Sequence, residues 1–203
     1  MKNLILAGGL ALAIGISNIG GFVRDGKRLD QLRENVLRLH ILADSDSESD
    51  QKLKLMVRDA ILEESGDIFS GAQDKSDAEQ IAAQNIGRIK EIAVETLRKN
   101  GCADAVSAEI AQVEFDERTY GDITMPSGEY TALRIKIGSA QGHNWWCVMY
   151  PPLCVPAACS EEIEDDEDAV KTCFTEEEQD ILYHPKKFKV RFAVWDKICG
   201  IFG

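Results

Sequence analysis

The segment from Gly142 to Pro156, GHNWWCVMYPPLCVP, carries the side chains of this chain with the greatest capacity for chemistry. It contains two of the six cysteines, Cys147 and Cys154. Between them, Pro151 and Pro152 remove two backbone donors and turn the chain, which brings the second cysteine back toward the first. The pattern therefore predicts a structural disulfide between Cys147 and Cys154.

A reactive thiol is the alternative, because a cysteine nucleophile would make this chain a hydrolase of cell wall or peptide. Such a thiol needs a base beside Cys147, and His143 or His40 would have to supply it. In a strand, however, His143 lies roughly 13 Å from Cys147. Free buried thiols are a third state that the sequence leaves open. The cysteines lack the spacing of a zinc knuckle and the three histidines are scattered, so we expect no metal. No catalytic constellation is evident either, and we expect no catalytic residue and no cofactor.

The same segment predicts a strand that is covered on both faces. Alternation along the strand places Trp145 and Trp146 on opposite sides. Tryptophan is common both in cores and at the centres of interfaces, so each is a candidate for either role. We expect at least one of them to pack in the core.

Asn35 to Ala43, NVLRLHILA, alternates in the manner of a half-buried strand. Arg38 and His40 share one face, where they contact either an acidic partner or carboxylates of the same domain. The serine-rich and acidic run from Asp44 to Asp50 lacks the glycine and glutamate that a calcium loop requires. We therefore predict turn and helix N-cap chemistry for this run.

Charge excludes one class of partner. The chain contains 35 acidic and 23 basic residues, for a net charge of −12. Nucleic-acid binding needs a continuous basic surface to neutralise phosphates, so we expect no nucleic-acid partner. Nothing in the sequence indicates a small-molecule substrate.

Leu4 to Val23 is an uncharged, mostly apolar stretch next to the N-terminus. As a helix it would be about 30 Å long, which matches the hydrocarbon core of a bilayer. Cleavage after Ser17 would release a secreted protein, and an uncleaved segment would anchor it. A buried core helix is the remaining alternative. Both membrane interpretations place the body outside the cytoplasm, where disulfides persist.

The remaining patterns predict helices and then strands. One helix starts near Gln51 and ends before Gly66, and a second runs from Ser76 to Asn100. Strands follow within residues 105–120, at 130–137 and in the tryptophan segment. We therefore expect an α+β fold: a single domain with a small mixed or antiparallel sheet of roughly four to five strands, two helices on one face, and a preceding N-terminal membrane segment.

We divide the chain into four parts. Residues 1–23 are a signal peptide or signal anchor, and residues 35–156 form the α+β domain. Residues 157–180 form an acidic loop, because Glu161 to Asp168 reads EEIEDDED. Residues 181–203 are basic and aromatic, and we predict a strand at Phe188 to Val194 followed by a short amphipathic helix. This last part packs on the domain or contacts an anionic membrane.

Three blocks carry a resemblance to a known family. They are RLHILADSDSESDQKLKLMVRD (Arg38 to Asp59), YGDITMPSGEYTALRIKIG (Tyr120 to Gly138) and NWWCVMYPPLC (Asn144 to Cys154). Together they resemble the signature blocks of the stage II sporulation protein R family of endospore-forming bacteria. The likeness covers residues 35–156, while the acidic run and the other four cysteines fall outside the family pattern.

The resemblance implies a signal and not an enzyme. Members of the family are exported from the forespore into the space that separates it from the mother cell. There they activate a membrane-embedded aspartic-type protease of the mother-cell side, which matures a sigma factor precursor. The residues that we expect to bind this partner, all within the matching blocks, are Trp145, Trp146, Arg38, His40 and Asp44.

Overall fold

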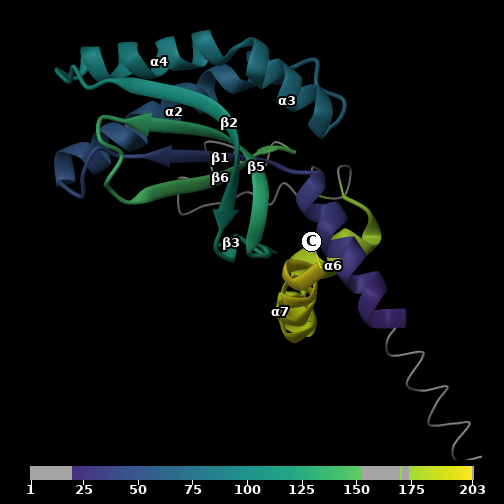
Figure 1. Cartoon of the computed structure of the whole chain (residues 1–203). Coiled ribbons are helices and arrows are strands. Elements are labelled where there is room, and N and C mark those ends of the chain that lie inside the picture. Colours follow the sequence, from purple (N-terminus) through teal and green to yellow (C-terminus); the bar gives the residue numbers. More distant parts are fainter. Residues whose placement is uncertain (1–19, 152–169, 171–173, 203) are drawn as a thin grey trace, which may run out of the picture.

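The computed structural model describes residues 20–151, 170 and 174–202 of the chain (Figure 1). Strand β1 (Leu37–Leu42) runs parallel to β5 (Gly128–Ile137) and antiparallel to β6 (Asn144–Tyr150). Strand β2 (Val106–Phe115) pairs antiparallel with β5, so the four-stranded sheet has the order β2-β5-β1-β6. This arrangement confirms the predicted α+β fold with a small mixed sheet.

One face of the sheet is covered by helices α2 (Glu48–Phe69), α3 (Lys75–Gln84) and α4 (Ile86–Lys99) (Figure 1). The predicted N-cap chemistry is present, since the Ser47 side chain accepts a hydrogen bond from the Asp50 amide at 3.1 Å. The helix predicted to start at Ser76 is instead two helices that meet at Asn85. Three helices therefore lie on this face where the sequence predicted two.

Apolar side chains that alternate along the strands form the core beneath these helices. β1 contributes Leu39 and Ile41, which meet α2 and α4 through Ile61 and Ile89. All four side chains are fully buried. At roughly 1.5 to 3 kcal/mol for each buried aliphatic side chain, this layer is a major source of stability.

A second core lies on the opposite face of the sheet. Cover on both faces was predicted for the tryptophan segment, but the predicted fold placed helices on one face only. The helix at residues 20–34 packs there with α6 (Glu176–Tyr183) and α7 (Pro185–Phe202) (Figure 1). A two-stranded hairpin of β3 (Arg118–Tyr120) and β4 (Ile123–Met125) contributes to the same cluster. Because both faces are covered, β1 is buried along its whole length, and the prediction of a half-buried strand was wrong.

The predicted strand at Phe188 to Val194 was also wrong, because these residues belong to α7. Phe188 and Phe192 are buried and their rings stack with centroids 5.4 Å apart. Residues four apart share a face of a helix, yet they also share a face of a strand. The apparent alternation was therefore compatible with both structures, and packing on the second core selects the helix.

Part of the predicted membrane segment, residues 4–19, lies outside the described residues, while residues 20–23 form the start of the helix at 20–34. Within the described ranges, no helix is both long enough and apolar enough to cross a membrane. The acidic run and Cys154 also lie outside the described residues. Helix α6 crosses the boundary that we predicted between residues 180 and 181.

Candidate partner-binding site

The five residues predicted to bind a partner do not form one surface. Arg38, His40 and Trp146 share the second face of the sheet, where His40 and Trp146 pair across β1 and β6. Trp145 lies on the opposite face, toward α2. Asp44 follows β1 in the loop that leads to α2. The site must therefore be built from the first three residues and their neighbours.

Arg38 is completely buried, although arginine carries a charge at every physiological pH. Its Nε donates a hydrogen bond to the Cys147 carbonyl at 2.9 Å, and one terminal nitrogen, Nη2, donates to the Tyr120 hydroxyl at 2.8 Å. The other terminal nitrogen, Nη1, has no partner among the described residues. The guanidinium thus joins β1, β6 and β3 in one network.

Aromatic rings surround this guanidinium in place of carboxylates. Its central carbon lies 4.3 Å from the ring centroid of Phe115, 5.0 Å from that of Tyr130 and 5.8 Å from that of Tyr120. Ring faces attract a cation, and in a desolvated site the attraction reaches about 2 kcal/mol. Burial also raises the pKa of Tyr120 and of Tyr130, so both hydroxyls stay protonated. Among the described residues no carboxylate forms an ion pair with Arg38, so the predicted contact with a carboxylate of the same domain is not found there. Contact of Arg38 with an acidic partner stays a prediction.

His40 is nearly as buried, with 4 % of its surface exposed. Its ring lies 5.8 Å from Phe115 and 6.1 Å from Trp146, measured between centroids. Burial lowers the pKa of His40 to about 4, and the nearby positive charges of Arg134 and Lys136 act in the same direction. The Asn144 amide offsets part of this effect, although neither ring nitrogen forms a hydrogen bond of good geometry. His40 is therefore neutral at neutral pH.

Trp146 is the member of the trio that remains partly exposed. The guanidinium of exposed Arg118 stacks over its ring, with 4.6 Å from the central carbon to the centroid. On the same face, β5 presents Arg134 and Lys136, whose side chains are 31 % and 33 % exposed and flank Glu109. We call Arg118, Arg134, Lys136 and Trp146 the basic aromatic surface. The buried cluster of Arg38 and His40 lies directly beneath it.

Trp145 forms a second tryptophan and arginine pair on the helical face. The central carbon of the Arg58 guanidinium lies 4.3 Å from the ring centroid of Trp145. Arg58 is one of the buried residues of α2 and is only 7 % exposed. The prediction that the two tryptophans face opposite sides is confirmed. Trp145 thus contributes to the packing of α2 on the sheet, whereas Trp146 contributes to the basic aromatic surface.

Asp44 holds a loop in place. Its carboxylate accepts a hydrogen bond from the Ser139 amide, which keeps the pKa of Asp44 below its usual value. Its carbonyl accepts hydrogen bonds from the Ser139 hydroxyl at 2.9 Å and from the Gln141 amide at 3.0 Å. Asp46 accepts in the same way from the His143 amide at 2.6 Å. Asp44 and Asp46 therefore tie the turn after β5 to the segment that leads into α2.

The alternative hydrolase site is not assembled. Cys147 is 3 % exposed on the helical face of the sheet, whereas His40 lies on the opposite face. His143 is exposed beyond the start of β6 and contacts Asp46. The predicted bridge from Cys147 to Cys154 stays a prediction, since Cys154 lies outside the described residues.

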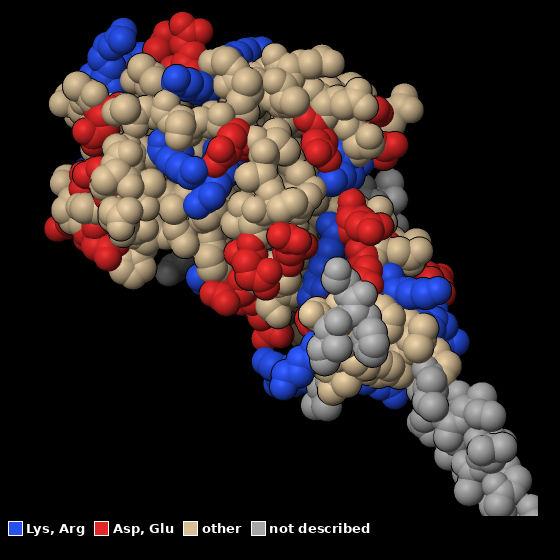
Figure 2. Space-filling model, viewed as in Figure 1, with Lys and Arg blue, Asp and Glu red and all other residues tan. Residues whose placement is uncertain are grey.

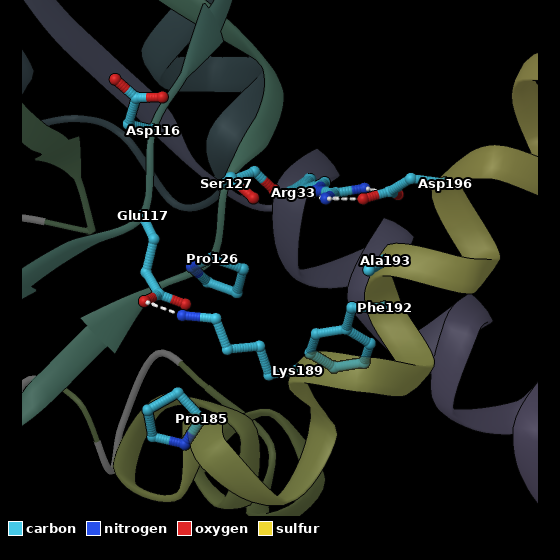
Figure 3. A pocket seen from close by; sticks show the side chains of 10 residues that line it. All are labelled: Arg33, Asp116, Glu117, Pro126, Ser127, Pro185, Lys189, Phe192, Ala193 and Asp196. Atoms are coloured by element: carbon cyan, nitrogen blue, oxygen red, sulfur yellow. Dashed lines mark hydrogen bonds and ion pairs between the residues drawn. The ribbon is translucent and has the colours of Figure 1, made fainter.

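A cavity of about 410 Å³ lies between the turns of the sheet and α7 (Figure 3). Its two cations are already paired: Arg33 contacts Asp196 at 2.8 Å, and Lys189 contacts Glu117 at 3.1 Å. Pro126 and Phe192 form part of its apolar wall. Sequence reasoning missed this cavity and also Arg118, because both depend on segments that only the fold brings together.

The geometry defines a class of protein: an α+β domain in which an aromatic cluster with a buried cation supports a partly exposed tryptophan and arginine surface. Residues 33–160 match the model of the family described as Stage II sporulation protein R, and the chain belongs to this family. The resemblance found in the three sequence blocks is thereby confirmed.

A curated relative gives the same result. The chain is 36 % identical over 136 residues to the Stage II sporulation protein R of Bacillus subtilis (strain 168). The alignment covers 66 % of this chain and 61 % of the relative, so the chain spans less than two thirds of the relative's length. No solved structure matches the chain.

Proposed function

We propose that the chain is an exported signal in endospore formation, which passes from the forespore toward the mother cell. It activates a membrane-embedded aspartic-type protease, and the protease then matures a sigma factor precursor of the mother cell. The observation that carries this proposal is the family match over residues 33–160, which supports a role in sporulation signalling. The uncharged stretch from Leu4 to Val23 supports export.

We assign the contact with the protease to the basic aromatic surface. Tryptophan and arginine are the residue types most enriched among those that dominate interface energies. Trp146 and Arg118 are already stacked in the free chain, so their side chains would lose little conformational freedom on binding. Glu109 offsets one of the three positive charges of this surface, which stays positive although the whole chain carries a net charge of −12. The complementary surface of the protease is therefore acidic.

Arg38 and His40 have an indirect role in this proposal, because both are buried beneath the surface that we assign to the partner. Tyr120 links the two levels: it accepts a hydrogen bond from Arg38 and donates one to the Trp146 carbonyl at 3.1 Å. The cluster thus fixes the backbone from which Trp146 extends. A rigid surface of this kind suits a ligand that must select one state of its receptor.

Charge reversal at Arg118 tests the assignment, because Arg118 is exposed and its replacement leaves the buried cluster intact. We expect Arg118→Glu to lower conversion of the sigma factor precursor in sporulating cells that export this chain. Arg98→Glu is the matched control, since Arg98 is exposed in the last turn of α4 on the other side of the sheet. Equal conversion by both variants, at equal exported amounts, would remove the basic aromatic surface from the site.

A further inference from the structure

Large hydrophobic side chains that are exposed in the described part of the chain gather at one end of the molecule. They are Val23, Val194 and Ile198, with 37 %, 45 % and 38 % of their surfaces exposed. Val23 lies in the helix at residues 20–34, and the other two lie one turn apart on α7. Because exposed apolar groups of this size normally scatter singly, their concentration on two adjoining helices marks an interaction surface.

Contacts between the two helices fix this arrangement. Trp195 packs its ring against Phe22, with centroids 5.8 Å apart, and covers Gly26 so closely that no side chain fits there. Its indole nitrogen donates a hydrogen bond to Asp30 at 2.9 Å. Arg191 forms an ion pair with Asp25. Helix α7 is thus fastened along the helix that continues from the uncharged stretch Leu4 to Val23.

Positive charge accompanies the apolar side chains. Lys186 and Lys197 on α7 are exposed, as are Arg24 and Lys27 beside Val23. Figure 2 shows Lys and Arg side chains around the α7 end of the molecule. This basic end is opposite in sign to the net charge of the whole chain, which is −12.

We propose that α7 and the start of the helix at residues 20–34 form a docking surface for an anionic phospholipid membrane. Val194 and Ile198 enter the interface between headgroups and acyl chains, and the lysines contact lipid phosphates. In sequence, this surface directly follows the uncharged stretch that we predict to enter a membrane. A membrane is therefore the occupant that fits the apolar exposure, the positive charge and the adjoining apolar sequence together.

The test uses the full chain and two kinds of vesicle, one of phosphatidylcholine alone and one that also contains phosphatidylglycerol. The quantity measured is the ratio of the two partition coefficients. Apolar insertion of residues 4–23 contributes to both coefficients and cancels, so the ratio reports the electrostatic contact. The paired substitution Lys186→Gln and Lys197→Gln should lower this ratio about 30-fold, because each lysine near an anionic surface contributes about 1 kcal/mol.

The matched control is the pair Lys52→Gln and Lys90→Gln, which removes the same charge from exposed positions on α2 and α4. We expect the control ratio to equal that of the unchanged chain. If the ratio of partition coefficients falls equally for the α7 pair and the control pair, the effect comes from overall charge. If the ratio falls for neither pair, α7 makes no contact with lipid. Either result overturns the proposal.

A second measurement separates a lipid partner from a protein partner. Amide hydrogen exchange in α7 should slow when the full chain meets the anionic vesicles, and the α7 pair should lose this protection. If the α7 pair instead lowers precursor conversion while its partition ratio is unchanged, the surface contacts a protein and the membrane assignment fails. The lipid measurements contain no protease, so their outcome is independent of the function proposed above.

Discussion

His40 makes the stability of this protein depend on pH in a defined window. Its pKa is about 4 in the folded protein, whereas an unperturbed histidine has a pKa of 6.5. Between these values the unfolded chain binds more protons than the folded one. Stability should therefore fall as the pH falls through about 6.5 and level off below about 4. The cause is burial, so the effect should persist at high salt.

The magnitude follows from the two pKa values. Each pKa unit corresponds to about 1.4 kcal/mol, so the His40 contribution between about pH 7.5 and about pH 5 amounts to about 2 kcal/mol. Replacement by leucine removes the titration and also removes two ring nitrogens that lack good hydrogen bonds. His40→Leu should therefore be as stable as the unchanged protein near neutral pH and about 2 kcal/mol more stable near pH 5.

Urea unfolding of the full chain in non-ionic detergent measures this difference, with tryptophan fluorescence as the signal because Trp146 lies 6.1 Å from His40. His184→Leu is the control, since His184 is exposed at the end of α6 and should leave the His40 contribution intact. Parallel stability profiles for His40→Leu and the unchanged protein, from about pH 7.5 to about pH 5, would refute the reasoning.

Two further substitutions test the interior. Tyr120→Phe should lower the free energy of unfolding by about 1.5 to 3 kcal/mol, because it removes a hydrogen bond to a charged group and leaves a nitrogen of Arg38 without its acceptor. A loss below about 0.5 kcal/mol in equilibrium unfolding would argue against the network. Cys147→Ser should cost about 2 to 4 kcal/mol if the predicted bridge to Cys154 forms. Mass analysis of alkylated protein checks the bridge, and a Cys147 thiol that reacts without prior reduction would contradict it.

The sheet could be predicted from the sequence because its signals are local. Alternation in β1 and β6 places Arg38 and Trp146 correctly on faces of the sheet. The caps of α2 and α4 are also local: Ser47 begins one helix, and Asn100 with Gly101 at φ 77° ends the other. Residues close in sequence determine each of these features.

The site could not be predicted to the same extent, because its geometry joins distant segments. The ring cage around Arg38 comes from Phe115, Tyr120 and Tyr130, which reach it only after β2, β3 and β5 are assembled. Coverage of the second face depends on α7, whose apolar spacing fits a strand equally well. The sequence therefore places Arg38, His40 and Trp146 on strands without determining which of them are buried and which is partly exposed.

One comparison shows whether the exported chain triggers maturation of the sigma factor precursor. Sporulating cells that lack their own family member would produce this chain in the forespore either complete or without Leu4 to Val23. Immunoblots would follow conversion of the precursor in the mother cell. We expect conversion with the complete chain and none when the shortened, folded protein stays in the forespore cytoplasm. Conversion of equal extent in both strains, or in neither, would contradict this expectation.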